Sequence, residues 1–302
     1  MISRARRRAA QRLGHPAADS APATATRPAP PRTAILIVNG FDRKGRWGEY
    51  NAAEARDYPW IDLCLRQVER HSAGSSYEVL VWDNACIPEQ RQLLRRHPRV
   101  RLFGRNDPAK SLGHGRALDR LLGKVRPGTE FVITLDTDSF PVRDGWIENL
   151  TGRLNGGVLL AGVWRDEMLR GRPAYVHPSC IAVRRDTLLR LGTPFAIAGG
   201  LDVGANLTEA VEALGGGISR LRRSNHWNPH FLMGALYGDL VYHQGAGSRN
   251  PQFMIGGAAE NHEPIRQALR NAAFADVDAL TEALAGDRDP EAVSEVARAA
   301  KG

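Results

Sequence analysis

A continuous apolar strand that ends on two carboxylates is the feature of this sequence that most constrains its fold. Residues 131–135 (FVITL) are followed at once by Asp136 and Asp138. A strand that is apolar on both faces is typical of a parallel sheet covered by helices on each side. In such sheets ligands bind beyond the carboxyl ends of the strands, so we expect the two aspartates to lie where a ligand enters. An Asp-rich turn that binds nothing is the simpler alternative.

The alternation of strands and helices predicts an α/β fold. Apolar segments of strand length and amphipathic segments of helix length follow one another, which favours βαβ units and a Rossmann-type, mostly parallel sheet flanked by helices. The predicted strands of the first half are 34–38, 77–82, 100–103 and 131–135, and its predicted helices are 60–71, 89–96 and 115–125. The second half is less regular, with predicted strands 158–163, 179–183, 218–221 and 240–243, helices 186–191 and 206–214, one amphipathic helix 264–284 and a last helix from 289.

The positive charge of the chain is concentrated near its beginning. The net charge is +8, but residues 1–32 hold seven arginines against the single acid Asp19, a net of +6. The remainder carries only about +2, so the sequence does not indicate a nucleic-acid-binding protein. The segment 1–32 is rich in Ala, Arg, Pro and Thr, lacks the apolar core of a secretory signal, and is predicted to be a disordered basic tail. A weak contact with an anionic membrane surface and a solvated leader without a role are both open interpretations.

The rest of the composition is that of an ordinary globular protein, with 42% hydrophobic and 25% charged residues. The apolar runs are far shorter than the roughly 20 residues needed to span a bilayer. Cys64, Cys86 and Cys180 are odd in number and widely spaced, which fits reduced thiols and a cytoplasmic location.

Three motifs in order carry a resemblance to a known family. A strand that ends in Asp83, a glycine-rich helix start at 113–117 (GHGRA) and the Asp-x-Asp motif of Asp136 and Asp138 resemble the nucleotide-binding half of GT-A glycosyltransferases, closest to the inverting family 2 type. The resemblance implies that Asp83 contacts the base of a nucleotide sugar. It also implies that the two later carboxylates hold ribose and metal, with Asp136 toward the ribose or a metal-bound water. Asp138 is the first choice of ligand for Mn²⁺ or Mg²⁺, which suit hard oxygen ligands together with a diphosphate.

The resemblance covers about residues 33–250 and suggests a division of the chain. The predicted parts are the basic tail 1–32, a nucleotide-sugar-binding half 33–140, an acceptor-binding half 141–258 and C-terminal helices 259–302. The acceptor implied by the resemblance is a glycan, a lipid-linked sugar or a small molecule.

A second site-like stretch follows the predicted strand 240–243. His243 ends that strand and Arg249 lies in the glycine-containing loop after it. The resemblance implies that a later histidine completes the metal site, and His243 is the candidate. A guanidinium in such a loop suits a clamp on the diphosphate. A surface histidine and a solvated arginine are the alternatives, and His177 could line the acceptor side, although a structural histidine before a proline is the favoured interpretation.

Sugar transfer to a hydroxyl also requires a base that removes the proton of the incoming group. Asp202 precedes the predicted helix 206–214, where the resembling family carries its base, and is the candidate catalytic residue. A helix cap is the alternative. The family often has two adjacent acids here, whereas this chain has Leu201 before Asp202. Asp166 and Glu167 are the reserve candidates.

Two missing sequence motifs narrow the class of enzyme, and two other functional classes stay open. The Gln-x-x-Arg-Trp signature of processive synthases is missing, which favours transfer of a single sugar. Neither a lysine-bearing phosphate loop nor a Gly-x-Gly-x-x-Gly dinucleotide motif occurs. A sugar-phosphate nucleotidyltransferase stays open because residues 39–46 (NGFDRKGR) loosely match its first loop. A non-catalytic module that binds nucleotide sugars or glycans is the third possibility.

Overall fold

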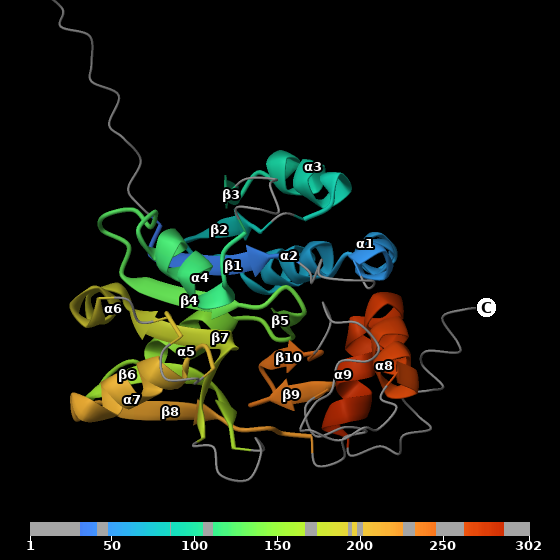
Figure 1. Ribbon diagram of the computed structural model, residues 1–302. Coiled ribbons are helices and arrows are strands. Elements are labelled where there is room, and N and C mark those ends of the chain that lie inside the picture. The colour runs from blue at the N-terminus through green and yellow to red at the C-terminus, as the bar shows by residue number, and fades with distance from the viewer. Residues whose placement is uncertain are drawn as a thin grey trace, which may run out of the picture.

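Most of the described chain builds one α/β body. The computed structural model describes residues 31–40, 48–84, 86–104, 111–166, 174–192, 195–197, 202–225, 233–245 and 263–286. Figure 1 shows a large central sheet with helices on both faces and a small second sheet beside it. The predicted α/β class with a mostly parallel, helix-flanked sheet is confirmed.

The large sheet has seven strands in the order β3-β2-β1-β4-β7-β6-β8. β7 is antiparallel to both of its neighbours, β4 and β6, and the other neighbouring pairs are parallel. The strands are β1 (Thr33–Asn39), β2 (Tyr77–Asp83), β3 (Val100–Gly104), β4 (Phe131–Leu135), β6 (Val158–Arg165), β7 (Tyr175–Arg184) and β8 (Gly217–Leu221). The small antiparallel sheet contains β5 (Ser139–Pro141), β10 (Val241–His243) and β9 (Ala235–Tyr237).

The helices agree with the predicted pattern in the first half and add to it. The predicted helices 60–71, 89–96 and 115–125 correspond to α2 (Trp60–His71), α3 (Pro88–Arg96) and α4 (His114–Leu122). The sequence analysis did not predict α1 (Gly48–Asp57), α5 (Trp146–Gly152), β5 or β9. In the second half, α6 (Arg185–Leu191) and α7 (Ala205–Ala213) lie where helices were expected.

The predicted single helix 264–284 is wrong, because the structure has two helices there. α8 (Glu263–Ala275) and α9 (Val277–Ala285) are separated by Asp276, whose backbone is extended. The Asp276 side chain accepts a hydrogen bond from the backbone N–H of Ala279 at 3.0 Å. Aspartate is a preferred N-cap because it satisfies an N–H group in the first turn, so it starts a new helix here. The apolar periodicity continues across the break and therefore did not reveal it.

The strands of the sheet are apolar throughout because both faces are covered. Ile35 and Ile37 of β1 pack into the cluster formed with α2, α5, α8 and α9. Ala34 and Leu36 of the same strand pack on the opposite face with α4 and α7. Successive side chains of a strand point to opposite faces, so each face needs its own apolar set. This three-layer arrangement explains the uninterrupted apolar runs of the sequence.

The beginning of the fold includes Arg32, which the sequence analysis assigned to the tail. Its carbonyl oxygen accepts hydrogen bonds from the backbone N–H groups of Glu130 and Phe131, and its side chain pairs with Glu130 at 2.8 Å. Residues 1–30, and the helix predicted from 289, lie outside the described part of the chain. Among the described residues, none of the helices combines the length and the apolar character needed to cross a membrane. Cys64, Cys86 and Cys180 are all buried free thiols.

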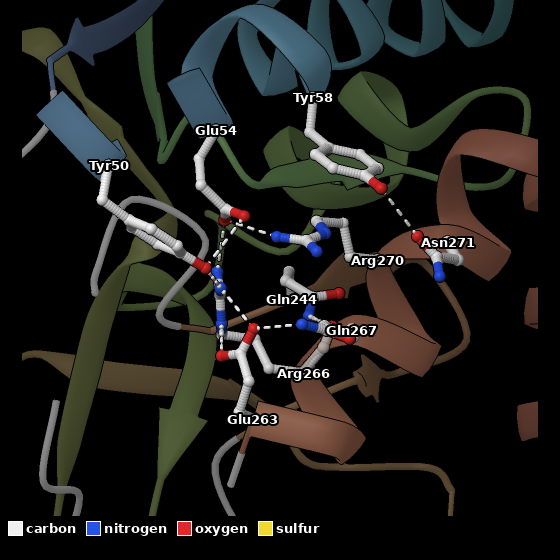
Figure 2. Close-up of polar contacts among 9 residues, drawn as sticks. All are labelled: Tyr50, Glu54, Tyr58, Gln244, Glu263, Arg266, Gln267, Arg270 and Asn271. Atoms are coloured by element: carbon white, nitrogen blue, oxygen red, sulfur yellow. Dashed lines mark hydrogen bonds and ion pairs between the residues drawn. The ribbon is translucent and has the colours of Figure 1, made fainter. Parts of the chain in front are cut away.

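A buried charge network joins α8 to α1 (Figure 2). Arg266 of α8 donates hydrogen bonds to Glu54 of α1 at 2.9 Å, to Glu263 at 2.8 and 3.0 Å and to the Tyr50 hydroxyl at 3.1 Å. Arg270 also pairs with Glu54. The two guanidinium side chains are only 4% and 6% exposed, so they depend on these carboxylates in place of water.

We therefore expect Glu54→Ala to lower the free energy of unfolding by about 3–5 kcal/mol, because it leaves buried arginines without their shared carboxylate. The matched control is Arg70→Ala, which breaks the exposed pair between Arg70 and Asp278 and should cost less than about 1 kcal/mol. Urea titration followed by circular dichroism measures both. Equal losses in the two variants would show that the network does not hold α8 on the body.

Candidate active site

The two aspartates of the Asp-x-Asp motif lie in a turn at the carboxyl end of β4. The backbone N–H of Ser139 donates to the Asp136 carbonyl oxygen at 3.1 Å and closes this turn. The carbonyl oxygen of Asp138 accepts from the backbone N–H of Gln244 at 2.9 Å, and His243 pairs with Ser139 in the small sheet. The sheet pairing therefore brings His243, which is more than a hundred residues later in the sequence, beside both carboxylates.

The side chains form a compact cluster of acids and imidazoles. His243 Nε2 lies 3.8 Å from Asp136 Oδ2 and 3.7 Å from Asp138 Oδ1. His177 Nδ1 lies 4.0 Å from Asp136 Oδ2. Asp136, His177 and His243 each offer a ligand atom, and these atoms all lie within 4.8 Å of one another. The group is thus small enough to surround a metal ion, and the carboxylate oxygens are of the kind that Mg²⁺ and Mn²⁺ prefer.

Arg165 and His114 also lie at the site, and the sequence analysis did not predict either of them there. Arg165 ends β6 and lies 2.9 Å, through its Nη2, from His243 Nδ1. His114 begins α4 and lies 3.4 Å, through Nε2, from Asp136 Oδ1. The sequence analysis included His114 in the glycine-rich helix start 113–117 without giving it a role, and it did not single out Arg165. The available signal was their position, since Arg165 ends an apolar strand and His114 begins a helix after another strand.

The sheet topology explains why these residues meet. β7 is antiparallel to β4 and to β6, so the start of β7 lies at the same edge as the ends of the other two. Tyr175 and His177 are therefore close to Asp136 and to Arg165, and Arg165 pairs with Tyr175 in the sheet. The edge thus collects residues from segments that are far apart in the sequence.

Burial favours the uncharged form of the His177 and His243 imidazoles. It lowers the pKa of His177 and of His243 well below the ordinary histidine value, and the positive charge of Arg165 adds to both shifts. At neutral pH each ring therefore has one N–H group and one nitrogen lone pair. The negative charge of the cluster comes from the aspartates.

Asp202 is connected to this cluster through Tyr175. Its Oδ2 accepts a hydrogen bond of 2.7 Å from the Tyr175 hydroxyl, and the Tyr175 ring is 6.0 Å from that of His177. The side chain of Asp202 does not cap α7, because the N-cap residue is Gly204 in a left-handed conformation with φ of 92°. Asp202 instead bonds the N–H of Val203 at 2.8 Å. The hydrogen bond from Tyr175 and the link to His177 are compatible with the predicted role of Asp202 as the base.

The other predicted site residues have different surroundings. Asp83 is 1% exposed, pairs with Arg91 and accepts from the backbone N–H of Cys86 at 2.8 Å. Its contact with a nucleotide base stays a prediction. Asp166 is exposed and pairs with Arg222 at 3.4 Å. Arg249, Glu167 and residues 41–46 of the first loop lie outside the described part of the chain.

Comparisons with known proteins give distant structural similarities. No family model matches the chain, and no curated protein matches it. A structure described as a nucleotide-diphospho-sugar transferase from Desulfovibrio desulfuricans G20 is 12% identical and covers 64% of this chain and 80% of its own, with a TM-score of 0.44. The galactosyltransferase LgtC, solved with donor and acceptor sugar analogues, is 14% identical over 62% of this chain and 73% of its own, with a TM-score of 0.39. 4-Diphosphocytidyl-2C-methyl-D-erythritol synthase from Anaerococcus prevotii DSM 20548 is 10% identical over 63% and 86%, with a TM-score of 0.41. Because the similarity is this low, we base the functional proposal on the side chains of the site.

Proposed function

We propose that this protein is a GT-A-type glycosyltransferase that moves a single sugar from a nucleotide-diphosphate sugar to an acceptor hydroxyl, with inversion at the anomeric carbon. The observation that carries the proposal is the placement of Asp136 and Asp138 at the carboxyl end of the central strand β4, with Asp202 nearby through Tyr175. Ligands of open α/β sheets bind at this edge. The acceptor is a glycan, a lipid-linked sugar or a small molecule.

The carboxylates have a defined role in this proposal. Asp136 and Asp138 would hold a Mn²⁺ or Mg²⁺ ion, which when bound neutralises the charge that develops on the leaving diphosphate. Asp136 also faces the ribose or a metal-bound water. Asp83 contacts the nucleotide base, and Arg249, which follows β10 in the sequence, binds the diphosphate.

Asp202 acts as the base. It takes the proton of the acceptor hydroxyl while that oxygen bonds to the anomeric carbon. The bond from this carbon to the diphosphate oxygen breaks, and its electron pair leaves with the diphosphate. The hydrogen bond from Tyr175 directs one carboxylate oxygen of Asp202, and the N–H of Val203 holds the other.

Metal-dependent donor binding is tested with Asp138→Asn, which keeps the shape of the side chain and removes its charge. In a thermal-shift panel of nucleoside diphosphates, Mn²⁺ should raise the melting temperature of the nucleotide complex in the parent and not in the variant, because a bound ligand stabilises the native state in proportion to RT ln(1 + [L]/Kd). The matched control is Asp166→Asn, whose carboxylate is exposed. An undiminished Mn²⁺-dependent shift in Asp138→Asn would contradict the assignment.

The assignment of the base predicts that Asp202→Asn lowers turnover by roughly 10² to 10⁴, with donor affinity and melting temperature little changed. Turnover is measured as release of nucleoside diphosphate together with the mass of the glycosylated acceptor. Asp166→Asn is again the control and should keep parental turnover. If the turnover of Asp202→Asn stays within a few-fold of the parent while that of Asp166→Asn falls, the base is Asp166, which follows β6, and not Asp202.

The same product assay separates the two alternative classes. A nucleotidyltransferase would release pyrophosphate from a nucleoside triphosphate and a sugar phosphate. A binding module would show the thermal shift without any product.

A further inference from the structure

The hydrogen bond between Arg165 and His243 determines which nitrogen of the imidazole carries the proton. An arginine side chain has donors only, so at 2.9 Å its Nη2 must donate to a lone pair on His243 Nδ1. An imidazolium has an N–H on both nitrogens and could not accept this hydrogen bond, so the ring is neutral and its single proton lies on Nε2. Nε2 is the nitrogen that faces Asp136 and Asp138. The group presented to the two carboxylates is therefore an N–H and not a lone pair.

The charges on both sides of the ring favour the same tautomer. A cation faces the lone pair of Nδ1, and two carboxylates at 3.8 and 3.7 Å face the N–H of Nε2. The opposite tautomer would place an N–H of the ring against an N–H of Arg165, and a bound metal ion would not relieve that contact. Arg165 is itself 5% exposed at the end of β6, so little room or water is available for it to turn away.

The second histidine of the cluster also accepts a hydrogen bond at Nδ1, and in this ring Nδ1 is the nitrogen that lies 4.0 Å from Asp136 Oδ2. The backbone N–H of Ser179 donates to His177 Nδ1 at 3.1 Å, so Nδ1 holds a lone pair and the ring proton lies on Nε2. Both imidazoles thus use Nδ1 as an acceptor toward the protein. Neither ring has an uncommitted lone pair for a metal ion in this arrangement.

We propose that Arg165 holds His243 as a hydrogen-bond donor toward the anionic side of the site, so that any divalent cation is bound by the carboxylates of Asp136 and Asp138 without an imidazole ligand. In this view Arg165 is a positioning residue. The Nε2–H of His243 lies too far from the carboxylates for a strong hydrogen bond and is placed to donate to an anionic oxygen that enters the site. This inference rests on the proposed function for the identity of that oxygen, a diphosphate oxygen of the donor.

The tautomer is measured directly by long-range ¹H–¹⁵N correlation spectra of the full chain labelled with ¹⁵N-histidine. We expect a protonated Nε2 and an unprotonated Nδ1 for His243, with and without Mg²⁺. His71 provides an internal control, because its Nδ1 contacts the carboxylate of Asp144 at 2.7 Å and must carry a proton. A protonated Nδ1 on His243 would overturn the proposal.

Metal affinity gives an independent measurement through a double-mutant cycle. In the parent background, His243→Ala should change the Mn²⁺ dissociation constant by less than about threefold, whereas loss of a ligand or its support typically costs about 10- to 100-fold. Arg165→Met frees Nδ1 to take the proton and should tighten Mn²⁺ binding. In the Arg165→Met background, His243→Ala should then weaken it by about tenfold or more. Electron paramagnetic resonance of free Mn²⁺ measures all four proteins.

A tenfold loss of Mn²⁺ affinity on His243→Ala in the parent would overturn the proposal, as would unchanged affinity on Arg165→Met. The spectra need neither a donor sugar nor turnover. The expected tautomer in a protein that transfers no sugar would therefore reject the proposed function and leave the role of Arg165 intact.

Discussion

The position of the site depends on the way in which β4 is held. β4 is hydrogen-bonded to β1 on one edge and to β7 on the other, and all its residues are buried. Because side chains alternate between faces, a shift of one residue would move each apolar set to the opposite face, where the packed neighbours fit the other set. The register is thus strongly specified. Leu135 is the last residue of the strand, and Asp136 and Asp138 are placed at its end by the packing behind them.

The protein handles buried charge in two different ways. In the network at α8, Arg266 and Arg270 face Glu54 and Glu263 directly, and each cation has a carboxylate partner. At the site, the buried Arg165 faces a neutral imidazole, which in turn faces the carboxylates. A directly paired charge stabilises a contact between helices, whereas the contact of Arg165 with His243 orients a ring whose other nitrogen faces the acids.

The sequence predicted those elements whose local pattern of apolar residues fits only one kind of secondary structure. The apolar strands and most helices were predicted from periodicity. Asp136, Asp138 and His243 were expected to share a site; His243 lies 3.8 Å from Asp136 and 3.7 Å from Asp138, and their shared function stays a prediction. β5 and β9 were not predicted, and each has only three residues, too few to show a period; β10 has the same length but lies within the segment 240–243 that was predicted as a strand. The break at Asp276 was missed because a side-chain cap outweighed a continuous apolar pattern. Arg165 and His114 were missed because their neighbours come from distant segments.

The sequence by itself determined the α/β class, the order of its main strands and the strand end on which the acids lie. These follow from side-chain periodicity and burial, which are local properties of the chain. Only the tertiary structure decided that β7 runs antiparallel and brings His177 and Arg165 to that edge. It also decided that Arg165 meets Nδ1 of His243, and so which nitrogen of the ring faces the acids. The physical reason is that a tautomer depends on a partner within 3 Å, and no local pattern specifies a contact between residues so far apart in the chain.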